Sequence, residues 1–149
     1  MPRSCLRLVS VGLLTVGLVG CVPATDLDPV TVRLVNASDF TLDPNLYAAS
    51  GTLSSSALFV PANLVTSFAD GGLATVEPGA SRTAMVDCDA AGTLGVHRPV
   101  FTDSVGLRGG RAAATSFVLS EGVTFRCGQT LVLTYRGTEA GFGVTYVVE

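Results

Sequence analysis

Apolar and polar residues alternate most regularly at the start and at the end of the chain's second, longer part. Residues 30–36 read VTVRLVN, in which aliphatic side chains at every second position predict a half-buried β-strand. The same period of two runs through 131–136 and again through 142–148. Because Gly137–Gly141 separates these last two segments, they predict a hairpin with a loop of about five residues.

The middle of the chain consists of short apolar segments bounded by Gly, Pro, Asp, Asn and Ser. Two of these segments are ambiguous. Residues 63–68 fit a helical turn or a strand, and 112–119 fit a strand or a short helix, since the latter contain three alanines. Pro99 within the strand-like run 93–101 suits an edge or a bulge, because proline cannot donate to a ladder. The other extended or apolar segments are 40–47, 57–60 and 82–88.

No segment carries an apolar stripe of three helical turns, so the pattern indicates an all-β fold. We expect an antiparallel β-sandwich, immunoglobulin-like, of about seven or eight strands. The turn Glu77-Pro78-Gly79 before a strand is similar to turns in bacterial immunoglobulin-like domains, although the Trp of antibody domains is missing. A small jelly roll and an open barrel are the alternatives.

The first residues have a different pattern, with a basic head and a continuous apolar run. Arg3 and Arg7 precede Leu8–Gly20, a run of 13 residues that is too short to span a bilayer as a helix, which takes roughly 20. This layout predicts a secretory signal peptide over residues 1–20. The alternative is that the run forms a buried N-terminal strand or helix of the domain.

The apolar run ends in Leu18-Val19-Gly20-Cys21, which resembles the lipobox of bacterial lipoproteins. The resemblance implies that Cys21 receives lipid, with acyl chains such as palmitate, and becomes the first residue of the mature protein. Two or three acyl chains hold a protein durably on a membrane. Val22 follows where some lipoproteins carry the Asp that retains them in the inner membrane, so the resemblance favours the outer membrane.

These observations divide the chain into three parts: a signal peptide over 1–20, the lipidated Cys and a tether over 21–29, and a β-sandwich domain over 30–149. Without residues 1–20, the chain has seven Arg and 12 acidic side chains, which gives a side-chain charge of 7 − 12 = −5. Lys is absent. A nucleic-acid-binding protein carries a basic patch. We therefore expect no nucleic acid as a partner.

Cys88 and Cys127 are the two cysteines left beside Cys21 in the exported part. An even pair in an oxidising compartment predicts a structural disulfide. Two free buried thiols and a redox pair are the alternatives, although a redox pair usually has the close C-x-x-C spacing that is absent here.

Candidate catalytic and metal-binding residues are few. His97 is the only histidine, and no nucleophile motif accompanies it, so we interpret it as a surface or partly packed residue. Residues 87–92 begin like a calcium loop but have Ala91 and Arg98 at later ligand positions. The glycine-rich stretch 106–111 lacks the Lys-Ser/Thr ending of a phosphate loop. The sequence predicts no catalytic residues, no metal and no cofactor.

The aromatic side chains are the remaining candidates for binding. Tyr47 and Phe68 lie near turns and are the best candidates for exposed contacts. Four others occupy alternating strand positions and are expected in the core: Phe125, Tyr135, Phe142 and Tyr146.

The leading hypothesis is a non-catalytic, lipid-anchored protein of the cell envelope that acts as an interaction or structural module. Its partners would be the membrane, through the lipid on Cys21, and an envelope protein or glycan. The mature domain resembles small uncharacterised envelope lipoproteins with an immunoglobulin-like sandwich. The alternative is an envelope lipoprotein that binds a small ligand or a glycan through loops at one end. An enzyme comes third.

Overall fold

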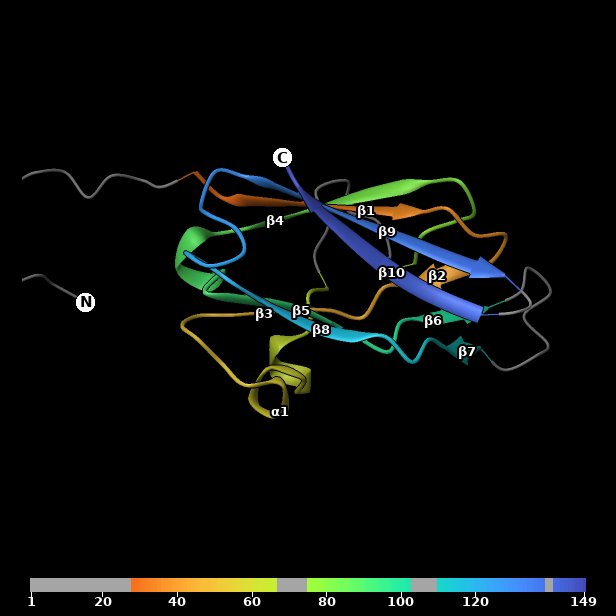
Figure 1. Cartoon of the computed structure of the whole chain (residues 1–149), viewed down its shortest axis with the longest axis horizontal. Coiled ribbons are helices and arrows are strands. Elements are labelled where there is room, and N and C mark those ends of the chain that lie inside the picture. Colours follow the sequence, from red (N-terminus) through yellow and green to blue (C-terminus); the bar gives the residue numbers. More distant parts are fainter. Residues whose placement is uncertain (1–27, 67–74, 103–109, 139–140) are drawn as a thin grey trace, which may run out of the picture.

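The computed structural model describes residues 28–66, 75–102, 110–138 and 141–149, which form a sandwich of two β-layers (Figure 1). The predicted signal peptide and Cys21 lie outside the described residues, as do Phe68 and most of the stretch 106–111. The predicted all-β fold is confirmed, with ten strands in the described part where about seven or eight were expected. In that part, no helix is long and apolar enough to cross a membrane.

One layer is a four-stranded sheet in the order β10-β9-β1-β4. Its strands are β1 (Val30–Asn36), β4 (Ser81–Val86), β9 (Thr130–Thr138) and β10 (Gly141–Val148). The alternation predicted for β1 is present, since Val30, Val32 and Leu34 are fully buried. β1 runs antiparallel to β4 but parallel to β9, so the sheet is mixed. The β9–β10 hairpin pairs as far as Thr138 and Gly141, and its loop is therefore shorter than predicted.

The second layer consists of two three-stranded sheets in the orders β2-β6-β7 and β3-β5-β8. Their strands are β2 (Thr41–Asp43), β3 (Leu46–Ala49), β5 (Thr93–His97), β6 (Val100–Thr102), β7 (Arg111–Ala112) and β8 (Ser116–Ser120). Each strand of one sheet is followed, or preceded, within a few residues by a strand of the other. The two sheets are thus halves of one layer, and the segment predicted as one strand over 93–101 is split between them.

The break between these halves runs through the three places where a strand of one half continues into a strand of the other: between β2 and β3, between β5 and β6, and between β7 and β8. The backbone is locally irregular at this line. Asn45 and Arg98 adopt positive φ angles of 45° and 47° there. Backbone bonds still cross the line, from the His97 amide to the Asn45 carbonyl at 3.2 Å and from the Ala113 amide to the Pro99 carbonyl at 2.9 Å. The pairing slips by one residue between β2–β6 and β3–β5, as in a β-bulge. Of the two alternatives predicted for Pro99, an edge or a bulge, the slip in register corresponds to the bulge.

Apolar side chains from the facing sides of both layers form one core. The first layer contributes the buried residues of β1, β4 and β9, and the second contributes Leu42, Leu46, Leu94, Val96 and Phe101. Tyr135 of β9 is the largest side chain in this core and is fully buried. Its hydroxyl donates a hydrogen bond of 3.3 Å to the carbonyl of Pro44, at the line of the break.

Burial raises the pKa of Tyr135 far above its usual value of 10.0, and the nearby Asp43 carboxylate raises it further. The phenol is therefore neutral and can donate its proton to Pro44. A group with a raised pKa in the folded state stabilises the fold below its unfolded pKa. That contribution is lost as the pH rises above about 10, where the unfolded chain ionises.

The short polar loop that follows β1, residues 37–40, is also stabilised by buried hydrogen bonds. Asn36 is fully buried, and its side-chain amide donates to the carbonyls of Phe40 at 2.7 Å and Val76 at 2.8 Å. Its oxygen accepts bonds from the Ser38 amide and the Ser38 hydroxyl. The predicted turn at Glu77-Pro78-Gly79 lies beside this loop, because the Gly79 backbone amide donates to the Asn36 carbonyl at 2.9 Å. Gly79 has a φ of 72°, which suits glycine.

We expect the substitution Tyr135→Phe to lower the free energy of unfolding by about 1–3 kcal/mol, because it leaves the Pro44 carbonyl buried without its donor. Urea unfolding of residues 22–149 measures the change, and Tyr146→Phe is the matched control on a partly exposed ring. The variant should also lose less stability than the wild type above pH 10. Equal midpoints for both variants would show that the Tyr135 hydroxyl does not stabilise the fold.

Candidate functional site

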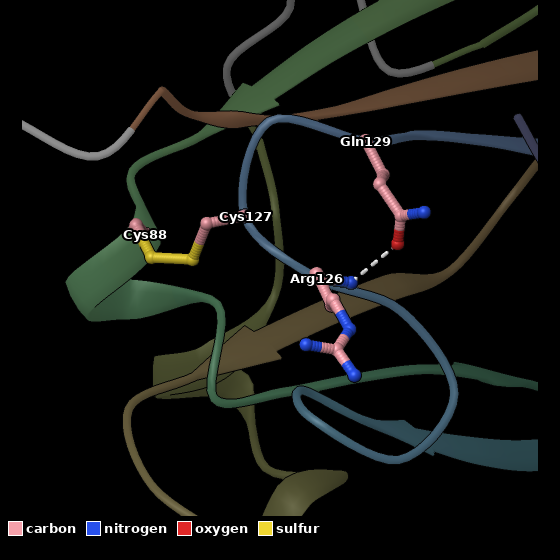
Figure 2. The surroundings of a disulfide bond; sticks show 4 residues. All are labelled: Cys88, Arg126, Cys127 and Gln129. Atoms are coloured by element: carbon pink, nitrogen blue, oxygen red, sulfur yellow. Dashed lines mark hydrogen bonds between the residues drawn. A yellow bond between two sulfur atoms is a disulfide. The ribbon is translucent and has the colours of Figure 1, made fainter.

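The predicted disulfide is present and closes one end of the sandwich (Figure 2). Cys88 lies in a short 3-10 helix, η2 (Cys88–Ala90), and Cys127 lies in the connection between β8 and β9. Their Cα atoms are 5.6 Å apart, which is a usual spacing for a disulfide. The bond joins two connections that each pass between the layers, because η2 links β4 to β5 and Cys127 lies between β8 and β9.

The chain joins the domain beside this disulfide. The Gly128 backbone amide donates to the carbonyl of Asp28, two residues before β1, at 2.9 Å, so the start of the domain is tied to the cysteine-containing loop. Gly128 has a φ of 78°, which suits glycine. The loop is also closed on itself, since the Arg126 amide donates to the Gln129 side-chain oxygen at 2.6 Å (Figure 2).

A shallow pocket of about 170 Å³ lies against the same loop. It is smaller than the 300–1,000 Å³ typical of pockets for drug-sized ligands. Arg126 and Gln129 bring charged and amide groups to it, and Val123 beside them is 88% exposed. The lining residues are Gly122, Val123, Thr124, Phe125, Arg126, Gln129 and Val148. The pocket can hold a small group, and it contains no pair of acid and base side chains.

The acidic loop that begins like a calcium site lies next to this end. Asp87 and Asp89 are exposed on either side of Cys88. Among the described residues, no three His, Cys, Asp or Glu side chains gather in a way that could hold a metal ion.

His97 lies at the opposite end of β5 and has two contacts. Its Nδ1 is 2.9 Å from the Ser116 hydroxyl, because the two residues are cross-strand partners in β5 and β8. Its ring stacks on Phe59, with centroids 4.6 Å apart and planes at 18°. In the described part of the chain, no carboxylate is hydrogen-bonded to the imidazole. A histidine base of the triad type needs such an orienting group, so this pair lacks the triad arrangement.

Phe59 also contacts Tyr47, so three rings gather on the outer side of the β3-β5-β8 sheet. The Tyr47 and Phe59 centroids are 5.3 Å apart in an edge-to-face arrangement. We call Tyr47, Phe59 and His97 the aromatic surface; all three are half-buried, and the neighbouring Val60 is 37% exposed. Tyr47 was predicted to make exposed contacts, and the structure places it in this cluster.

The aromatic surface exists because a helical segment packs against the sheet at a glycine. This segment contains α1 (Ser55–Leu58) and a 3-10 helix, η1 (Pro61–Asn63), and lies outside the sandwich below β3 and β5 (Figure 1). A Cβ on Gly95 would lie only 2.7 Å from the Leu58 side chain and 2.9 Å from the Phe59 ring. The side-chain amide of Asn63 donates to the Leu58 carbonyl at 2.9 Å and holds the end of α1.

The aromatic residues expected in the core divide into two groups. Phe125 and Tyr135 are buried as predicted, and Phe142 is packed against the core. The prediction for Tyr146 is wrong, since its side chain is 44% exposed. Tyr146 lies at the open edge of its sheet, where it contacts Phe117 of β8 with ring centroids 5.5 Å apart.

Comparisons with known proteins give no family. No protein-family model matches the chain, and no curated protein matches it. Among solved structures, the chain is similar to one described as a "putative cell adhesion protein from Bacteroides uniformis ATCC 8492". The two are 14% identical, with a TM-score of 0.37 over 82% of this chain and 50% of that one. A TM-score this low corresponds to backbones that differ widely.

We expect the double substitution Cys88→Ala/Cys127→Ala to lower the free energy of unfolding by about 4 kcal/mol, because the disulfide closes a loop with a sequence separation of 39. Urea unfolding of residues 22–149 measures the loss. Reductant added to the wild type should give the same shift and should leave the double variant unchanged. An unchanged wild-type midpoint in reductant would contradict a stabilising disulfide.

Proposed function

We propose that this chain is a lipid-anchored, non-catalytic protein of the cell envelope whose aromatic surface binds a protein partner. The observation that carries the proposal is the cluster of Tyr47, Phe59 and His97 on a rigid sheet, outside the core. Clustered aromatic side chains are typical of interface centres, where they bury large areas at small entropic cost. These rings lie on the side of the β3-β5-β8 sheet that faces away from the core.

The position of the tether supports contact along the flank of the domain. Six residues lie between Cys21, which would carry the lipid, and Asp28, and the seven steps along an extended chain reach at most about 25 Å. Asp28 is bonded to Gly128 in the disulfide-containing loop. A lipid on Cys21 would therefore hold the disulfide end near the membrane, and the aromatic surface would face sideways towards neighbouring envelope components.

The packing of the rings favours a protein over a glycan as the partner. A sugar-binding platform presents an open ring face, whereas one face of Phe59 is covered by the His97 ring at 4.6 Å. Tyr47 contacts Phe59 edge to face. Together with the neighbouring Val60, the two rings form an irregular apolar surface. An irregular apolar surface of this kind suits apolar side chains of another protein. The Nδ1 of His97 is engaged by Ser116, which supports a structural part for this histidine and a non-catalytic domain.

The anchor has a direct test. We expect Cys21→Ala to move the chain from the membrane fraction to the soluble fraction of the cell, because it removes the thiol that would carry lipid. Fractionation followed by immunoblotting measures the change, and Cys5→Ala, within the predicted signal peptide, is the control that should stay with the membrane. Membrane association of Cys21→Ala that survives a carbonate wash would overturn the anchor.

The partner is tested by photo-crosslinking in intact cells. A photo-reactive amino acid at Val60 should give a discrete protein adduct, and the same probe at Met85, on the other layer, should not. Adding Tyr47→Ala should reduce the Val60 adduct about tenfold, as expected for an aromatic hot spot worth about 1.4 kcal/mol or more. Protease resistance checks that the variant is folded. A glycan adduct, or equal adducts at Val60 and Met85, would overturn the proposed protein contact.

A further inference from the structure

The outer edge of the four-stranded sheet is an unusually unprotected strand. β10 is the last strand in the order β10-β9-β1-β4 and pairs only with β9 in the described part of the chain. In Figure 1 it is drawn in front of its sheet, with no other strand over it. Its eight residues read GFGVTYVV and contain no charge and no proline. Natural edge strands usually carry charges, prolines or bulges that prevent pairing with another chain.

The hydrogen-bond pattern shows which groups of β10 point to the open side. Glu149 and Thr130 exchange both backbone bonds, at 2.8 and 3.1 Å. Since the register of β9 and β10 is regular, the bonded pairs continue through Val147, Thr145 and Gly143. The backbone groups of the intervening residues, Val144 and Tyr146 among them, therefore point away from β9. They form a row of donors and acceptors along an exposed edge.

The side chains of β10 complement a second β10 that runs in the opposite direction. When Thr145 faces Thr145 of the second copy, Val144 faces Tyr146 and Gly143 faces Val147. Val147 is 60% exposed in the single chain, and a Cβ on Gly143 would meet nothing within 4 Å. Nothing in the single chain requires glycine at position 143, and interior strand glycines often mark the close approach of another chain.

Charge offers no obstacle to this pairing. Glu149 is the acidic residue that follows β10, and its carboxylate lies 4.0 Å from the guanidinium of Arg33 on β1. Opposite it in the same register stands Gly141, so like charges do not meet.

We propose that two copies of this chain associate through antiparallel pairing of their β10 edges, with the twofold axis at Thr145. The four outward residues of each strand would exchange about eight backbone hydrogen bonds and join the two sheets into one. The edge lies on a different layer from the aromatic surface, so a dimer of this kind leaves the aromatic surface free.

The test uses the position on the axis. In the proposed ladder, Thr145 and its counterpart form a non-hydrogen-bonded pair with Cα atoms about 4.5 Å apart, which is close enough for a disulfide. The full chain carrying Thr145→Cys should give a dimer on a non-reducing gel after mild thiol oxidation of cells. Met85→Cys, which is exposed on the far edge strand of the same sheet, is the control and should give roughly tenfold less.

A second variant separates dimer contact from folding. Val144→Pro removes an outward N–H that β9 does not use, which an edge strand accommodates, and it shortens a side chain that is partly packed against the core. Combined with Thr145→Cys, it should abolish the crosslinked dimer while the chain keeps its protease resistance. The proposal is overturned if Thr145→Cys crosslinks no more than Met85→Cys, if it crosslinks to a different protein, or if the dimer persists with folded Val144→Pro.

Discussion

The architecture depends on how the second layer is broken and held at the break. Asn45 and Arg98 take up positive φ angles there, and the side-chain amide of Asn45 donates to the Arg98 carbonyl at 3.1 Å. Both residues have side chains, so this backbone conformation is tolerated only where the surroundings support it. The hydroxyl of Tyr135 supplies part of that support from the opposite layer, by bonding to the Pro44 carbonyl. The buried phenol thereby ties the line of the break to the first layer.

The sequence predicts the first layer well and the second layer poorly, for a physical reason. β1 and β9 bury one side against the core, so strict alternation is imposed on their residues and can be read directly. The second layer is made of two- to five-residue strands whose break depends on partners distant in sequence. Pro99 is the local signal of that break, but the matching breaks beside Asn45 and between β7 and β8 become apparent only once the strands are paired. Likewise, residues 57–60 are apolar enough for a strand, yet they belong to α1 and its exit.

The candidate sites divide in the same way. The disulfide follows from the number of cysteines and the predicted export, because two thiols in an oxidising compartment have few alternatives. The aromatic surface could be inferred only through Tyr47. Phe59 reaches His97 because Gly95 lets the Leu58 and Phe59 side chains approach the sheet. The alternation of apolar and polar residues does not predict that contact. An interior glycine in a strand pattern is the one local signal, since it marks a close approach without naming what approaches.

The low content of charged residues bears on both the stability of the fold and its two proposed interfaces. With few charged side chains outside the predicted signal peptide, the domain relies on burial and on the disulfide, and it has little left to protect its edges. Segments 75–76 and 64–65 lie along β2 and β3 and bond to Leu42 and Leu46, so those edges are partly covered. Within the described ranges, no segment is bonded to the open side of β10 in this way. An anchored chain also diffuses in two dimensions, which raises the local concentration of second copies and favours weak edge pairing. The predicted anchor and the open strand are therefore mutually consistent: the lipid on Cys21 would supply the concentration at which β10 pairs.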